Sequence, residues 1–128
     1  MPKATQLVLA LPSRPGVLAK VAAALAAAKV NITAVSTGGS GRRGRLRLLV
    51  SDVVRARRAL KAAGYRPTEE AAYVLRLRNR PGALARLAQR VAKAGVNITA
   101  AYGTTAGSGS ASVVLTVPKT AKARRALR

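Results

Sequence analysis

Two short motifs occur twice in this chain, with the same separation each time. Residues 14–19 read Arg-Pro-Gly-Val-Leu-Ala, and residues 80–85 read Arg-Pro-Gly-Ala-Leu-Ala. Residues 30–34 read Val-Asn-Ile-Thr-Ala, and the same letters return at residues 96–100. A fixed spacing between two motifs, with free variation between them, indicates that one structural unit was duplicated. The sequence therefore predicts two units, 1–69 and 70–128, and a site built by one unit has a counterpart in the other.

The hydrophobic pattern predicts the same order of elements in both units. In the first unit we expect strands at 6–11, 30–37, 45–50 and 65–68, a helix at 16–29, a loop at 38–44, and a helix that is capped by Ser51 or Asp52 and runs to Ala63. In the second unit we expect strands at 72–77, 96–104 and 112–117, a helix at 82–94, and a last helix with Pro118 in its first turn.

This order predicts an α+β fold made of two ferredoxin-like βαββαβ sandwiches in tandem. Each would have an antiparallel sheet with both helices on one face. The second unit lacks its last strand, because the sequence ends within the last helix. That strand would lie beside the first strand of its own unit, so the edge at 71–77 is exposed, covered by another chain, or left open by truncation. Units this small bury limited apolar area alone, which favours pairing with a second surface.

The composition argues against catalysis. The chain has no Cys and no His, and its only carboxylates are Asp52, Glu69 and Glu70. Acid–base pairs, nucleophilic triads and metal cages need these residue types in number, so we expect a non-enzymatic protein without cofactor or metal. Neither a signal peptide nor an apolar run of membrane-spanning length is present, which predicts a cytoplasmic protein that does not bind membranes.

The motifs themselves resemble those of a known family. An Arg-Pro-Gly-x-Leu-Ala turn between strand and helix, followed by Val-Asn-Ile at the next strand, is similar to the ACT domain, a small amino-acid-sensing regulatory module. The chain looks most like the stand-alone tandem ACT proteins of prokaryotes. Its second copy, with Asn79-Arg80-Pro81-Gly82 and Val96-Asn97-Ile98, is similar to the serine-sensing ACT domain of phosphoglycerate dehydrogenase. The resemblance implies side-by-side pairing of units, with the ligand between the turn of one unit and the Asn-bearing strand of its neighbour.

The residues give a physical reason for a ligand site. A helix that starts at a glycine offers free main-chain N–H groups and the positive end of its dipole to a carboxylate. The side-chain carbonyl of an asparagine can accept a hydrogen bond from an ammonium group. The candidate ligand-binding residues are Ser13, Arg14, Gly16, Val17, Leu18 and Asn31 in the first copy, and Asn79, Arg80, Gly82, Ala83, Leu84 and Asn97 in the second.

Of the two copies, the second is the better candidate, because Ser13 stands where the second copy has Asn79. The histidine that assists serine binding in the dehydrogenase has no counterpart, so the amino acid is left open. A simpler interpretation is also open: Pro-Gly forms a plain turn, Asn satisfies nearby backbone, and the ACT units serve only assembly. The expected partners are a small amino acid, a second copy of the chain in a homodimer, and a biosynthetic enzyme that the chain regulates.

The charge suggests a rival function. The chain carries 24 Lys and Arg against 3 acidic residues, a net charge of +21, which attracts polyanions such as nucleic acid. Arg45, Arg47, Arg76 and Arg78 alternate with apolar residues and would make the open face of the sheet basic. Against this function, the aromatic residues that stack on bases are nearly absent, with only three Tyr. The Gly- and Arg-containing loop at 38–44 lacks the ending of a phosphate-binding loop and is interpreted as a mobile hairpin.

Overall fold

The computed structural model describes residues 3–40, 42–105, 109–118 and 120–127. Within it the chain forms two compact units. The N-terminal unit is Thr5–Glu70, and the C-terminal unit combines Lys3 and Ala4 with Ala71–Arg128. Two strands, β1 (Lys3–Pro12) and β4 (Thr68–Arg78), contribute residues to both units. The fold is the expected α+β type, with one βαβ repeat in each unit.

The N-terminal unit has the strand order of a ferredoxin-like sandwich. Its further elements are α1 (Val17–Ala27), β2 (Ile32–Ser40), β3 (Arg43–Val50) and α2 (Val53–Ala62). Strand β3 lies between β2 and β1 and is antiparallel to both, and β4 follows on the other side of β1. Apolar residues at every second position of β1 and β3, such as Leu7, Leu9 and Leu48, therefore share one face. They pack against both helices in one core.

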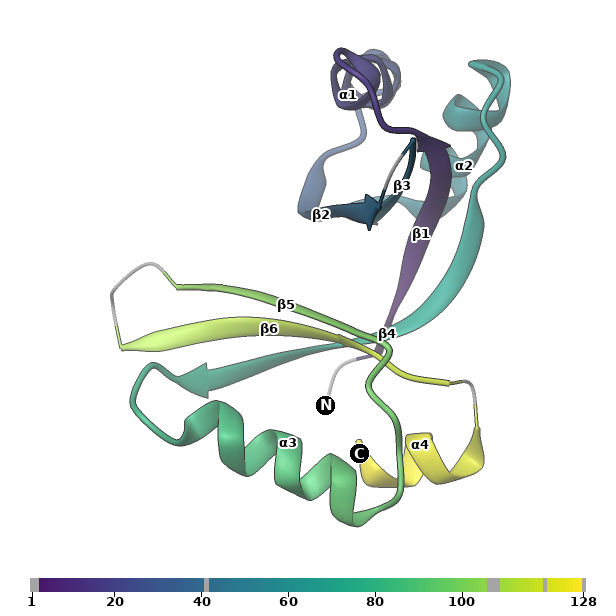
Figure 1. The fold of residues 1–128 in the computed structure, drawn as a ribbon. Coiled ribbons are helices and arrows are strands. Elements are labelled where there is room, and N and C mark those ends of the chain that lie inside the picture. The colour runs from purple at the N-terminus through teal and green to yellow at the C-terminus, as the bar shows by residue number, and fades with distance from the viewer. Residues whose placement is uncertain (1–2, 41, 106–108, 119, 128) are drawn as a thin grey trace. The chain divides into compact units, whose positions relative to one another are not determined.

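The C-terminal unit repeats the arrangement with α3 (Ala83–Lys93), β5 (Ala100–Thr105), β6 (Ser110–Thr116) and α4 (Ala121–Ala126). Strand β6 lies between β4 and β5 and is antiparallel to both. Figure 1 shows α3 and α4 on the same face of these three strands. Their core contains Leu87 and Val91, which are one helical turn apart on α3, together with Leu75 and Leu115 from the strands.

Several expected boundaries were wrong. A closing strand at 65–68 and a separate strand at 72–77 were expected, but one continuous strand, β4, begins at Thr68. Pro118 is outside the last helix, because the Thr120 side chain caps α4 by accepting a hydrogen bond from the main-chain N–H of Ala123. The loop at 38–44 is largely β-structure, since β2 runs to Ser40 and β3 starts at Arg43; Gly41 lies outside the described residues.

The start of β1 changes the interpretation of the missing strand. Thr68 Oγ1 donates to the Val8 carbonyl at 3.4 Å, and Gln6 Nε2 donates to Glu70 Oε1 at 3.3 Å, so β1 and β4 run antiparallel. This register brings Ala4 beside Ala72. The first residues of β1 thus take part of the place where a closing strand of the C-terminal unit would lie. None of the three alternatives taken from the sequence included this arrangement.

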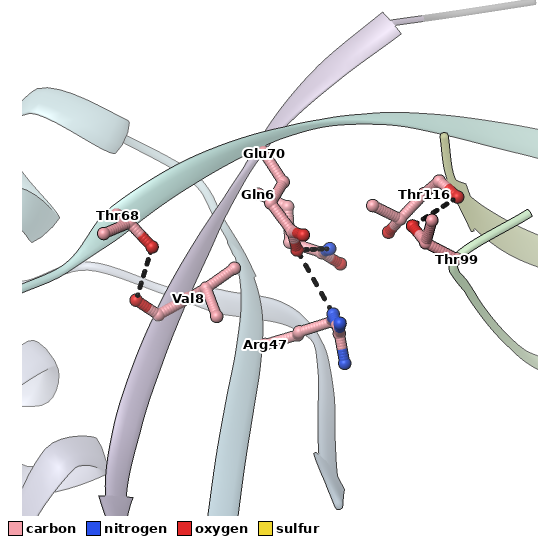
Figure 2. Close-up of polar contacts among 7 residues, drawn as sticks. All are labelled: Gln6, Val8, Arg47, Thr68, Glu70, Thr99 and Thr116. Atoms are coloured by element: carbon pink, nitrogen blue, oxygen red, sulfur yellow. Dashed lines mark hydrogen bonds and ion pairs between the residues drawn. The ribbon is translucent and has the colours of Figure 1, made fainter. Parts of the chain in front are cut away.

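A polar cluster ties the start of β4 to its neighbours. Glu70 Oε1 accepts hydrogen bonds from Gln6 Nε2 and, at 3.2 Å, from Arg47 Nε (Figure 2). Gln6 is fully buried, and the Arg47 side chain is only 15% exposed. Arg47 was expected on an open basic face, but it is paired here because a buried cation needs a close anionic partner. Figure 2 also shows the Thr99 hydroxyl, which donates to the Thr116 carbonyl at 3.1 Å just before β5.

No helix among the described residues has both the length and the apolar character needed to cross a membrane.

Candidate functional site

The two glycine-opened helix tips have the same conformation. Gly16 and Gly82 are the N-cap residues of α1 and α3, with φ of 87° and 90°. Neither helix has a side-chain cap at this end. The other two helices do, because Asp52 caps α2 and Thr120 caps α4. Only glycine adopts such positive φ readily, so the repeated glycine is explained by the turn.

Each tip leaves main-chain N–H groups pointing out of the first turn. The first intrahelical bonds run from the Lys20 N–H to the Gly16 carbonyl and from the Arg86 N–H to the Gly82 carbonyl, both at 3.0 Å. The N–H groups of Val17 and Ala83 donate to the carbonyls of the turn, those of Arg14 and Arg80, at 3.5 and 3.3 Å. The next amides, such as those of Leu18 and Leu84, have no acceptor within their own helix. With the helix dipole, such a tip favours an anionic group.

The turn before each helix is fixed by the neighbouring hairpin. The main-chain N–H of Ser13 donates to the Arg42 carbonyl at 2.7 Å, and that of Asn79 donates to the Gly109 carbonyl at 2.9 Å. The two bonds occupy matching places in the repeat, although Ser13 and Asn79 differ in side chain. The turn is therefore held in both copies by the same main-chain contact, whichever side chain it carries.

A surface hollow of about 390 Å³ lies at the N-terminal tip. It is formed by the end of β1, the turn, the first turn of α1 and the facing ends of β2 and β3. Four of the predicted ligand-binding residues line it: Ser13, Arg14, Val17 and Leu18. Gly16 shapes the turn without lining the hollow. Nothing lies within 4 Å of the position that a Cβ on Gly16 would take, so the space in front of this helix tip is open.

The C-terminal tip has a matching hollow of about 250 Å³. Its lining includes Asn79, Arg80, Ala83 and Leu84, which correspond to the four residues of the first hollow. Gly82 again shapes the turn, and a Cβ there would contact only the Arg86 guanidinium, with Nη1 at 3.4 Å. Each copy of the duplicated unit therefore has a hollow at its helix tip, lined in part by equivalent residues but different in volume.

The two asparagines of the second motif lie at the opposite end of each unit. Asn31 precedes Ile32, which pairs with Val50 at one end of β3, whereas Pro12, next to the turn, pairs with Arg43 at the other end. At about 3.3 Å per residue this separates Asn31 from the turn by about 23 Å. Asn97 is placed in the same way before β5, and both asparagines are exposed. Within one unit the turn and the asparagine are therefore not brought together.

The hairpin wall of the hollow was not foreseen from the sequence. Thr37, Gly38 and Arg45 line the first hollow, and Thr104 and Val113 line the second. The strand–helix–strand order could have predicted this wall. Because β1 and β2 are parallel, their carboxyl ends lie at the same end of the sheet as the start of the helix between them. The segment at 38–44 belongs to this wall rather than to a detached loop. Among the described residues, no three His, Cys, Asp or Glu side chains gather in a way that could hold a metal ion.

Comparisons with known proteins find the same fold in other chains. A comparison with curated proteins finds no match. Among solved structures, a protein of Bacteroides thetaiotaomicron is similar at 29% identity and a TM-score of 0.88, over 98% of this chain and 86% of that one. The regulatory subunits of aspartate kinase from Thermus thermophilus and Thermus flavus are similar at 22% and 23% identity, with TM-scores of 0.69 and 0.67. These alignments cover 100% and 98% of this chain, and 94% and 90% of the Thermus chains.

The family profile of the ACT domain matches residues 5–63 and 73–127, so nearly the whole chain is accounted for by two copies of one domain. The two matched segments contain the two glycine-opened helix tips and both asparagines. The chain belongs to the ACT-domain family.

Proposed function

We propose that this protein is a non-enzymatic regulatory sensor that binds a small amino acid at its helix tips. The single observation that carries the proposal is the pair of matching hollows, each in front of an uncapped helix that starts at a left-handed glycine. An α-carboxylate would bind the exposed main-chain N–H groups of the first helical turn. The aliphatic residues beside them, Val17 and Leu18 or Ala83 and Leu84, suit a small side chain.

The ammonium group of the ligand needs acceptors that its own hollow supplies only in part. We infer that Asn97 or Asn31 of a neighbouring unit provides one, since each lies about 23 Å from the turn of its own unit. Leu18 and Leu84 support pairing of units. They hold the same place in the repeat and are 45% and 57% exposed at the rims of the hollows. A homodimer of two chains would cover them.

The regulatory mechanism is linkage. A ligand held between two units binds the paired state better than the separate units, so it shifts the protein toward that state. The aspartate kinase regulatory subunits that share the fold support a role in controlling a biosynthetic enzyme. The partner would be an enzyme on which this chain acts as a regulatory subunit.

The test is a thermal-shift panel of the common amino acids on the full chain. One or a few amino acids should raise Tm, and at a hundred times Kd the stabilisation is about 2.7 kcal/mol. Asn97→Ala should reduce the shift, and Asn31→Ala/Asn97→Ala should abolish it. Gln89→Ala removes a comparable amide from an exposed position on α3 outside the hollow and should leave the shift intact.

The same panel includes duplex DNA and RNA at low and high salt. If no amino acid stabilises the chain and nucleic acid does so only at low salt, the sensor proposal is wrong and the basic surface is the functional one. Sedimentation with and without the stabilising amino acid tests the dimer. A ligand that binds without changing assembly would contradict the linkage mechanism.

A further inference from the structure

Over its second half, the outer edge of β4 has no neighbouring strand among the described residues. Strands β1 and β4 pair in the register that places Ala4 beside Ala72. In this register Lys3, the first described residue of β1, lies beside Tyr73. Within the described part of the chain, the neighbours of β4 are β1 and β6 only. Among the described residues, no strand lies beside the main-chain N–H and C=O groups of Val74–Arg78 on this side. Such an edge is a template for another strand.

A groove of about 540 Å³ lies between this edge and α3. Its apolar part comes from Leu75, Leu77 and Leu87, which belong to the core of the C-terminal unit or pack against it. On α3 the lining residues are spaced at i, i+3, i+4 and i+7 from Ala83, so a single helical face borders the groove. An edge strand with an apolar strip beside it suits an extended chain whose alternate side chains point into the groove.

Five arginines surround this groove, and all are exposed: Arg76, Arg78, Arg80, Arg86 and Arg90. The described ion pairs engage Arg47, Arg55 and Arg57 and none of these five. No Asp or Glu follows Glu70 in the sequence, so the segment that forms the groove has no carboxylate of its own to offer.

The other copy shows that these arginines are not a general property of the repeat. The positions equivalent to Arg76, Arg78 and Arg90 are Ala10, Pro12 and Ala24. The position equivalent to Arg86 is Lys20, and only Arg80 has an arginine counterpart, Arg14. The motif residues are shared between the copies, whereas these arginines are concentrated beside the second half of β4.

We propose that the groove beside β4 binds an acidic, extended segment of a partner protein, which adds a strand to the Val74–Arg78 edge. The edge supplies main-chain hydrogen bonds, as in other cases of strand addition. Apolar side chains of the segment face Leu75, Leu77 and Leu87. Its Asp or Glu side chains lie opposite Arg76 and Arg78 across the strand pair, while Arg86 and Arg90 on α3 add to the positive potential of the groove.

Charge and shape separate this occupant from two others. A second copy of the chain adding its own β4 would place arginines opposite arginines, which is destabilising in cross-strand pairs. A nucleic acid would meet the charge but not the apolar strip, and none of the three Tyr residues lines the groove to stack on bases.

The experiment measures binding of a labelled short peptide of alternating Glu and Val to the full chain. We expect binding that a Lys/Val peptide of equal length does not show. Arg76→Gln/Arg90→Gln should weaken it about tenfold or more, since Arg76 loses a charge-assisted contact and Arg90 part of the positive potential of the groove. Arg42→Gln/Arg43→Gln removes the same charge from exposed positions of the N-terminal unit and should change Kd less than about twofold. Neither pair of positions lines the amino-acid hollows, so a failure here does not bear on the sensor proposal.

Backbone pairing is tested with two N-methylated forms of the peptide, each methylated along one strand edge. One form should lose binding and the other keep it. Equal binding of both forms, or equal loss in the two double variants, would show unspecific charge attraction and overturn the proposal. The proposal is also overturned if a single-stranded oligonucleotide binds the groove and the peptide does not. A dimer of the chain that dissociates at saturating peptide would overturn it as well, because the groove would then be the dimer interface.

Discussion

At the scale of single residues, the repeat shows where one copy is strained. Lys29 follows α1 with φ of 59°, and the equivalent Gly95 follows α3 with φ of 73°. Both donate their main-chain N–H to the helix they terminate, Lys29 to Ala26 at 3.0 Å and Gly95 to Ala92 at 2.9 Å. A left-handed conformation costs a non-glycine residue about 1–2 kcal/mol and costs glycine almost nothing. The same turn is therefore less favourable in the first copy.

We accordingly expect Lys29→Gly to raise the free energy of unfolding by about 0.5–1 kcal/mol, because relief of the strained φ exceeds the added chain entropy of glycine. Lys20→Gly makes the identical change inside α1 and should lower it by about 1 kcal/mol. Urea unfolding followed by circular dichroism measures both. Destabilisation of similar size in the two variants would show that Lys29 is not strained.

At the scale of secondary-structure elements, β4 depends on contacts at its first residues. Glu69 and Glu70 are adjacent, yet they lie in different surroundings. Glu70 is shared by the buried Gln6 and the mostly buried Arg47, whereas Glu69 pairs with Arg57, whose side chain is 38% exposed. An ion pair at the surface contributes only about 0–1 kcal/mol, while removal of an acceptor from buried donors costs more.

The expected result is that Glu70→Ala destabilises the protein by about 1–3 kcal/mol and Glu69→Ala by less than about 1 kcal/mol. Glu70→Gln keeps an acceptor in place and should lie between the two. The measurement is the midpoint of denaturant unfolding for each variant, compared at an unchanged dependence of the free energy of unfolding on denaturant concentration. Equal effects of the two alanine variants would mean that the Gln6–Arg47–Glu70 cluster does not hold the start of β4.

At the scale of the whole molecule, charge repulsion opposes folding. The net charge is +21, and the described ion pairs use only the three acidic residues, all of which lie in the N-terminal unit. The remaining cations repel one another in the compact state, and salt screens such exposed charges over about 10 Å at 0.1 M.

Raising sodium chloride from about 0.02 M to about 0.3 M should therefore raise Tm. A neutral osmolyte at matched viscosity serves as the control for unspecific solvent effects. A fall of Tm with salt would indicate that the few ion pairs outweigh the repulsion, contrary to the charge distribution.

Much of the fold was predictable from the sequence, because the information is local. The two motifs at one spacing predicted two α+β units, and apolar periodicity placed α1 and α3 to within a few residues. For the candidate site, the turn residues Ser13, Arg14, Asn79 and Arg80 do line the hollows. The hairpin walls were missed, since strand ends that meet at one edge are far apart in the chain.

By itself the sequence determined the duplicated unit, the glycine-dependent helix tips and the lack of Cys and His, since each depends on residue type and short-range spacing. Only the tertiary structure decided that β4 is one strand, that Arg47 is paired with Glu70, and that Lys3 and Ala4 group with the C-terminal unit. It also decided that each asparagine lies at the far end from its turn. These features come from pairing between strands distant in sequence, whose register no local pattern specifies.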